Sequence, residues 1–197
     1  MEFNQEYTNY QLRRSVLRKF IRRLYMRHAA KYVRGSALDF GCGVGDLLQL
    51  LPEGSMGLEV NEATVQYTQS IGLPVELYNL EVDRYQFQCV RNSNFKTFII
   101  SHVLEHLENP DEIFQTILQS TERLGIERVI LVVPGLKGFH RDTTHKTFIN
   151  IDYLRAKNLF PPSGFSITTL EYFPFNFSWM GRFFTHNELF LVYDRQS

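Results

Sequence analysis

Residues 37–46 read Ala-Leu-Asp-Phe-Gly-Cys-Gly-Val-Gly-Asp, and no other segment constrains the architecture as strongly. The first half is short and apolar, as expected for a buried strand, and the second half has glycine at three alternate positions. Glycines after a strand allow positive φ and let a ligand approach the bare main chain. We predict a strand over 36–40, a ligand-binding loop over 41–45, and a helix over 46–51 whose free N–H groups face the ligand.

Apolar segments typical of strands alternate with segments typical of helices through the rest of the chain. Strands are predicted over 56–60, 75–78, 95–101 and 129–133, and helices over 62–71 and 111–124. Apolar strands separated by helices indicate an α/β fold, with a mostly parallel sheet covered by helices on both faces. The last two predicted strands, 165–172 and 188–193, are joined by a long loop without a crossover helix. We therefore expect an antiparallel pair at the C-terminus.

Length and composition restrict the class of protein. A chain of 197 residues with 44% hydrophobic and 21% charged residues can bury a sufficient core, which excludes a disordered or fibrous protein. Its two cysteines, Cys42 and Cys89, exclude a four-cysteine zinc site. The longest clean apolar run, 129–133, is too short to cross a membrane, and residues 1–11 lack the pattern of a secretion signal. We expect a cytoplasmic, single-domain protein.

Charge is unevenly distributed along the chain. Residues 1–34 contain nine Lys or Arg and two Glu, a net charge of +7. The remaining residues contain twelve Lys or Arg and nineteen Asp or Glu, a net charge of −7. Apolar residues at spacing four, among them Leu12 and Leu24, predict a basic amphipathic helix over 9–34. We expect this segment, 1–35, to pack on a ligand-binding domain formed by 36–197. Its basic face could also contact an anionic surface.

The glycine loop also discriminates between ligands. A dinucleotide-binding loop has a third glycine where this chain has Asp46, and an acid there would repel a pyrophosphate. An NAD-type oxidoreductase is therefore kept only as an alternative. The observed pattern, Asp39-x-Gly41-x-Gly43-x-Gly45, resembles motif I of the class I S-adenosylmethionine (SAM)-dependent methyltransferases. SAM has no phosphate and carries an ammonium, a carboxylate and a sulfonium, so an acid near the loop suits its positive end.

Three further segments extend this resemblance over about residues 36–135. Glu59 ends the second strand, where a carboxylate can accept hydrogen bonds from both ribose hydroxyls; alternatively, it caps the helix that follows. Asn79, with Glu81 as the alternative, lies where the family binds the adenine amino group. Residues 99–110, including Val103-Leu104-Glu105-His106-Leu107, resemble the fourth strand and the following segment of type-11-like and type-23-like small-molecule methyltransferases.

The resemblance implies a Rossmann-like class I methyltransferase sheet and SAM as the cofactor. The residues that it assigns to cofactor binding are Asp39, Gly41, Cys42, Gly43, Gly45, Glu59, Val60, Asn79, Leu80, Ser101 and His102.

Several histidines are candidates for catalysis. Residues 102–106 fit H-x-x-E-H, the inverted zinc-protease signature, but Pro110 leaves no room for the long helix which that site requires. We expect His106 to orient a loop. The loop 135–148 contains His140, Asp142 and His145, which lack a clear fourth metal ligand, so no metal is expected. His145 is the first candidate for a general base and His102 the second, with Asp142 beside them.

The methyl acceptor is the least determined part of the prediction. We favour O-methylation of a small molecule or saccharide, and keep a non-catalytic SAM-binding or partner-binding protein as an alternative. Eleven of the 28 aromatic residues lie in 160–197, where they could line a substrate pocket, form a dimer contact or pack in the core. Without aromatic residues interleaved among the basic ones, nucleic acid is not an expected partner. The sequence leaves the oligomeric state open.

Overall fold

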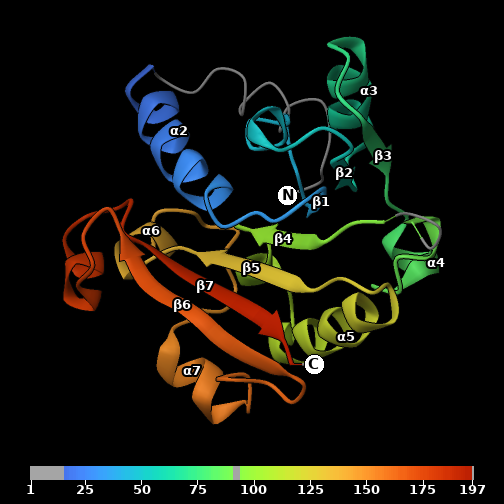
Figure 1. Cartoon of the computed structure of the whole chain (residues 1–197). Helices are drawn as coiled ribbons and strands as arrows, with labels where there is room; N and C mark the ends of the chain where they lie inside the picture. The colour runs from blue at the N-terminus through green and yellow to red at the C-terminus, as the bar shows by residue number, and fades with distance from the viewer. Residues whose placement is uncertain (1–15, 91–93, 197) are drawn as a thin grey trace.

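The computed structural model describes residues 16–90 and 94–196, and a seven-stranded sheet forms its centre (Figure 1). The strand order is β3-β2-β1-β4-β5-β7-β6. The strands are β1 Ala37–Phe40, β2 Met56–Glu59, β3 Val75–Leu77, β4 Thr97–Ser101, β5 Arg128–Val133, β6 Phe165–Phe173 and β7 Glu188–Arg195. β1 to β5 run parallel, and β7 lies antiparallel between β5 and β6. This arrangement confirms the predicted α/β class and the antiparallel C-terminal pair.

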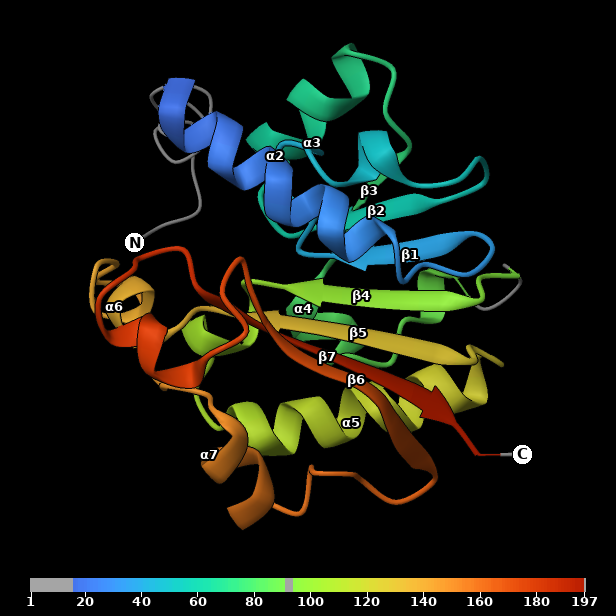
Figure 2. The same cartoon turned by 60° about the vertical axis from the view of Figure 1, so that its left-hand side comes forward.

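Helices cover both faces of the sheet, as predicted. The α-helices are α2 Val16–Ala30, α3 Glu62–Ser70, α4 Leu80–Asp83, α5 Pro110–Arg123, α6 Leu136–Phe139 and α7 Ile151–Ala156. Figures 1 and 2 show α2 and α5 on opposite sides of the sheet. The central strands are buried on both faces: Ile99 and Ile130 pack with α2, and their neighbours Phe98 and Val129 pack with α5. Alternate side chains of a strand point to opposite faces, which explains the continuous apolar runs in the sequence.

The prediction of a regular helix over 46–51 is wrong. This segment forms only a short 3-10 helix, Leu48–Leu50. Leu51 is already extended, with φ −85° and ψ 156°, because the ring of a following proline, Pro52, disfavours the α conformation in the residue before it. Gly45, with φ 81°, fixes the other end.

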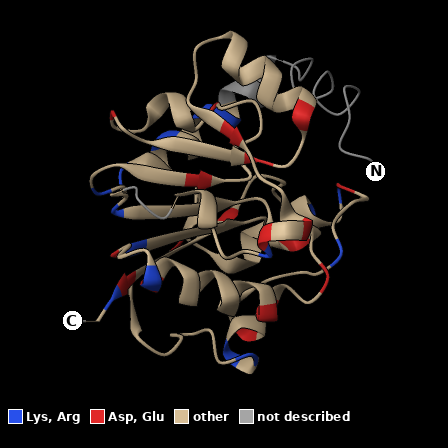
Figure 3. Ribbon diagram, turned by 90° about the vertical axis from the view of Figure 1, so that its right-hand side faces the viewer, with Lys and Arg blue, Asp and Glu red and all other residues tan. Residues whose placement is uncertain are grey.

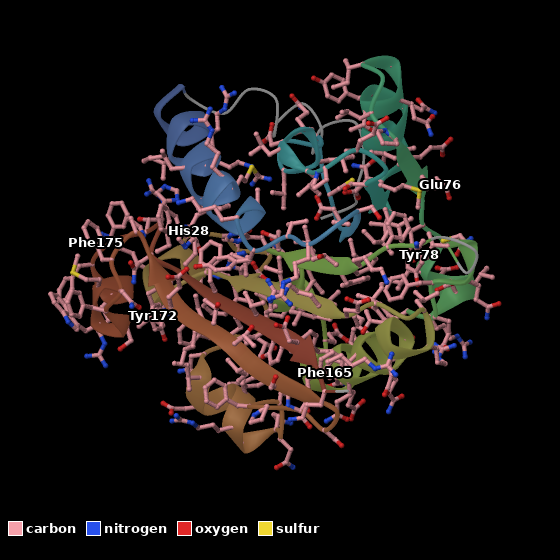
Figure 4. All side chains as sticks on the ribbon, viewed as in Figure 1. His28, Glu76, Tyr78, Phe165, Tyr172 and Phe175 are labelled. Atoms are coloured by element: carbon pink, nitrogen blue, oxygen red, sulfur yellow. The ribbon has the colours of Figure 1, made fainter. Side chains whose placement is uncertain are left out.

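The basic N-terminal helix covers one face of the sheet, and Leu24 is the residue that departs from the predicted apolar face. The structure describes it from Val16, so Leu12 lies outside the described residues. Tyr25, Met26 and Ala29 are buried, whereas Leu24 is 40% exposed. Residues spaced by four drift by about 40° per step around a helix of 3.6 residues per turn, so the apolar face shifts along it. His28, labelled in Figure 4, fixes the helix to β6. Its ring stacks on that of Phe173, with centroids 4.2 Å apart.

Basic residues gather at the edge of the sheet where the chain ends (Figure 3). There Arg128 makes a bidentate pair with Asp194, with two nitrogen–oxygen distances of 2.6 Å, and donates to the Tyr32 carbonyl. This pair joins β5 to β7 and to the segment after α2. Among the described residues, no helix is long and apolar enough to cross a membrane.

The glycine loop at the end of β1 has the backbone conformation that its sequence predicts. Gly41, Gly43 and Gly45 have φ values of 73°, 54° and 81°. A Cβ atom on Gly41 would lie 2.4 Å from Val103 Cγ2, which follows β4. The loop therefore requires glycine both for its dihedral angles and for its contact with the neighbouring strand end.

We predict that Gly41→Ala destabilises the fold more than Gly72→Ala does. Gly72 has a similar φ of 82°, but a Cβ there would meet nothing within 4 Å, so it is a matched control for backbone strain alone. Gly72→Ala should lower the free energy of unfolding by about 1 kcal/mol. Gly41→Ala should lower it by roughly 1–3 kcal/mol more, because its Cβ would overlap Val103. Denaturant unfolding of both variants measures this difference. Equal losses would mean that the close approach of the loop to Val103 is unimportant.

β1 also buries an acid within the sheet. Asp39 is 2% exposed, and its Oδ2 has no hydrogen-bond partner among the described residues. Burial raises the pKa of Asp39 to about 7, Arg22 partly offsets this, and Glu59 adds to it.

Because the pKa of Asp39 is raised on folding, the folded state holds this proton more tightly than the unfolded state. Its contribution to stability is therefore greatest below pH 4 and is lost as the pH rises to about 7. We expect Asp39→Asn to match the wild type at about pH 3 and to be on the order of 2 kcal/mol more stable at pH 8. Urea unfolding across this range is the measurement. Asp152→Asn, at an exposed acid, is the control for loss of one charge. A constant difference between wild type and Asp39→Asn at all pH values would contradict the prediction.

Candidate functional site

A cavity of about 320 Å³ lies where the parallel strands end. Its walls come from the residues that follow β1, β2, β4 and β5, from α2, and from the loop after α6. β7 runs antiparallel to β5, so its first residue, Glu188, reaches the same edge of the sheet. Ligands of open α/β sheets bind at this carboxyl edge. The volume lies within the range of small-molecule sites.

Glu59 holds the glycine loop in place from the neighbouring strand. Its Oε2 accepts a hydrogen bond from Gly43 N at 2.9 Å, and its Oε1 accepts from Val60 N and Asn61 N at 2.8 and 2.9 Å. Burial raises the pKa of this carboxyl, and the three N–H donors partly offset the rise. Glu59 does not cap α3; Asn61 does so, accepting a hydrogen bond from Ala63 N. The alternative role considered for Glu59 is therefore excluded.

The cavity brings together most of the residues that the resemblance assigned to the cofactor. Those in its lining are Gly41, Gly43, Glu59, Val60, Leu80, Ser101 and His102. Asp39 and Asn79 lie next to lining residues in sequence, Gly45 lies two residues beyond Gly43, and all three are outside the lining itself. The side chain of Cys42 packs in an apolar cluster with Leu48, Val65 and Val75. Cofactor contacts by these four residues stay predictions.

Asn79 uses its side chain within the protein. Its Oδ1 accepts a hydrogen bond from Val82 N at 3.1 Å and so caps the short helix α4. The next residue, Leu80, lines the cavity. Asn79 thus positions the segment that borders the cavity, and its contact with an adenine amino group is untested.

His102 lies between two buried acids at the end of β4. Its Nδ1 is 3.3 Å from Glu105 Oε1, and its Nε2 is 3.7 Å from Glu188 Oε2. Burial alone would lower the pKa of His102, but the two carboxylates outweigh that effect and raise it. Burial raises the pKa of Glu188, the charge of His102 lowers it, and the net direction is upward. His102 also has a φ of 57°, an uncommon conformation for a residue other than glycine.

The loop after β5 brings His145 and Asp142 over the same cavity. His145 Nδ1 lies 2.8 Å from the Phe139 carbonyl oxygen, and the His145 ring packs against His106 with centroids 4.6 Å apart. Thr144 Oγ1 lies 3.0 Å from His106 Nδ1 and donates to Asp142 Oδ1 at 2.6 Å. His106 therefore orients this loop, as predicted. All three candidates for proton transfer, His145, His102 and Asp142, line the cavity.

Sequence reasoning missed several residues that line the cavity. Arg22 and Tyr25 reach it from α2, which the sequence treated only as a covering helix; the rings of Tyr25 and His102 are 5.4 Å apart. Glu188 was missed as well, although a charged residue at the start of a long apolar strand is a detectable signal. The exposed aromatic residues Phe177 and Trp179 are absent from the lining, so of the three roles considered for the C-terminal aromatic residues they do not have that of a wall of this cavity.

Solved structures share this fold at low sequence identity. A SAM-dependent methyltransferase from Archaeoglobus fulgidus superimposes with a TM-score of 0.68 at 18% identity, covering 90% of this chain and 94% of that one. Magnesium protoporphyrin IX methyltransferase from Synechocystis PCC 6803 with bound SAH gives a TM-score of 0.64 at 16% identity, covering 93% of this chain and 89% of that one. The plantazolicin methyltransferase BpumL, in complex with a monoazolic desmethylPZN analog and SAH, gives a TM-score of 0.61 at 12% identity, covering 97% of this chain and 89% of that one.

These similarities identify the fold as that of the class I methyltransferases. No curated protein sequence matches the chain significantly. One family model does match, over residues 25–142, which is more than half of the chain. That segment contains the glycine loop, Glu59, the residues after β4 and the loop as far as Asp142. The family is described as methionine biosynthesis protein MetW, and this chain belongs to it.

Proposed function

We propose that this protein binds SAM in the cavity at the sheet edge and transfers its methyl group to an acceptor. The observation that carries the proposal is the glycine loop held by the buried Glu59, with both lining one cavity. Solved methyltransferases of the same fold, described with bound SAH, support it. The antiparallel β7 counts against the NAD-type oxidoreductase, because dinucleotide-binding sheets are mostly parallel.

The residues present fit SAM in their chemistry. Gly41 and Gly43 offer bare main chain in the cavity wall, and Val60 and Leu80 offer apolar surface for a base. Glu59, Glu188 and the unpartnered Oδ2 of Asp39 provide buried negative charge near the cavity. A sulfonium and an ammonium would compensate that charge, whereas a phosphate would not.

Each residue then has a distinct task in binding. Glu59 would accept hydrogen bonds from the two ribose hydroxyls. The segment of Asn79 and Leu80 would border the adenine, and Ser101 and His102 the amino-acid part. When bound, SAM supplies an electrophilic methyl carbon for in-line displacement. The task of the protein is to align the acceptor with that carbon and to exclude water.

The acceptor that we favour is a hydroxyl of a small molecule or saccharide. A hydroxyl retains its proton at neutral pH, so its methylation benefits from a nearby base. His102, held between two carboxylates, and His145 are the candidates, with Asp142 beside them. Arg22 and Arg141 also line the cavity, and they favour an acceptor that carries an acidic group.

One observation favours a second function. The matching family is described by methionine biosynthesis, and SAM is made from methionine. A chain that binds SAM without transferring its methyl group would suit a sensing or partner-binding role in that biosynthesis. This is the non-catalytic alternative considered from the sequence, and the two functions share the same cofactor site.

Replacement of Glu59 tests the cofactor site. We expect Glu59→Gln to weaken SAM binding roughly 30-fold or more, because two hydrogen bonds to a charged acceptor are lost. Isothermal titration calorimetry gives the Kd, and a thermal melt verifies that the glycine loop still folds. Glu62→Gln is the matched control, since Glu62 is exposed and only three residues away. An unchanged Kd in Glu59→Gln would remove the central support for the proposal.

Transfer itself is tested with SAM labelled on the methyl group. The protein is incubated with small-molecule, saccharide and macromolecular fractions of a cell extract, with Glu59→Gln as the control. We expect label in the small-molecule or saccharide fraction with the wild type and a strongly reduced signal with the variant. Tight SAM binding without label in any fraction would favour the non-catalytic function instead.

A further inference from the structure

Three side chains that could act as metal ligands come together beside the cavity. Glu105, His106 and His145 each offer one ligand atom, and these atoms lie within 4.8 Å of one another. Glu105 and His106 follow β4, and His145 belongs to the loop after β5. The main chain keeps the two segments together, because the Glu105 carbonyl accepts hydrogen bonds from Lys146 N at 2.7 Å and Thr147 N at 3.2 Å.

The carboxylate of Glu105 is buried beside two histidines. The residue is 0% exposed, and neither Oε1 nor Oε2 accepts a hydrogen bond among the described residues. The nearest bases are His102, with Nδ1 3.3 Å from Oε1, and His145, with Nε2 3.9 Å from the same atom. A fully buried carboxylate without hydrogen bonds is costly unless a cation compensates it.

Both histidines are oriented as metal ligands are. The carbonyl oxygen of Phe139 can only accept, so the hydrogen of His145 lies on Nδ1 and the lone pair on Nε2. Thr144 donates its hydroxyl hydrogen to Asp142, so it accepts from His106 Nδ1, which likewise leaves the lone pair on Nε2. In a histidine that binds a metal through one ring nitrogen, the other ring nitrogen usually donates its hydrogen to a backbone carbonyl, a carboxylate or water.

We propose that Glu105, His106 and His145 bind a divalent transition-metal ion such as Zn²⁺. Two imidazoles, one carboxylate and positions open to a cavity form a donor set that zinc uses in catalytic sites. Mg²⁺ and Ca²⁺ prefer oxygen ligands alone. The separation of 3.9 Å between His145 Nε2 and Glu105 Oε1 exceeds by about 0.5 Å the spacing around a tetrahedral ion with bonds of about 2.1 Å. The three ligand atoms lie within 4.8 Å of one another, so metal binding requires the side chains to move closer together.

This site changes the expectations drawn from the sequence. No metal was expected there, because the loop by itself lacked a full set of ligands; the fold supplies the others from the segment after β4. An ion on Nε2 of His145 would also occupy the lone pair that a general base needs. His102, which lies outside the three ligands, is then left as the candidate base.

The test measures metal binding directly, without activity. Untagged protein is stripped with a chelator and dialysed against Zn²⁺, Co²⁺ or Mg²⁺, and bound metal is quantified. We expect one Zn²⁺ per chain, a visible absorption spectrum with Co²⁺, and no competition by Mg²⁺. His106→Gln and His145→Gln should each weaken Zn²⁺ binding roughly 100-fold or more. Thr144→Val, which removes only the outer-shell partner, should weaken it about 10-fold.

His140→Gln is the matched control, since His140 is an exposed histidine of the same loop and should leave Zn²⁺ binding unchanged. Circular dichroism and thermal melts verify that each variant folds. Absence of bound Zn²⁺ in the wild type, or equal binding by the wild type and both ligand variants, would overturn the inference and leave His102 as the partner of Glu105. SAM binding is measured on the same samples, so failure of the metal site and failure of the proposed function are distinguishable.

Discussion

The carboxylate of Glu59 is the contact on which the geometry of the site depends. It joins the loop after β1 to the loop after β2 through Gly43 N, Val60 N and Asn61 N, all within 2.9 Å. Main-chain amides that leave a strand end have no partner in the sheet and must find one. A single buried acid satisfies three of them, and it fixes the glycine loop at the cavity wall in doing so.

Buried acids then determine what the cavity can accept. Asp39, Glu59, Glu105 and Glu188 are all at most 7% exposed, and they surround one edge of the sheet. Burial raises the pKa of Asp39, Glu59 and Glu188, which means that the folded protein holds these carboxylates at a cost. Such a site favours cations, and both proposals follow from this: a sulfonium and an ammonium at one end, and a metal ion at the other.

Much of the fold could be predicted from the sequence because strands and glycines leave local signals. The run at 129–133 and the glycines at 41, 43 and 45 identified the buried strand and the loop, and both are present. The failures have local reasons too. Pro52 removed the helix predicted at Asp46, and the drift of a four-residue spacing around α2 left Leu24 exposed.

The sequence by itself determined the α/β class, the position of the ligand loop and the acid that holds it, because these follow from residues close together in the chain. Only the tertiary structure decided that Arg22, His106, His145 and Glu188 share one cavity. They come from α2, from the segment after β4, from the loop after β5 and from the start of β7. Side chains that meet through strand order and direction leave no pattern in a single sequence, since no local spacing relates them.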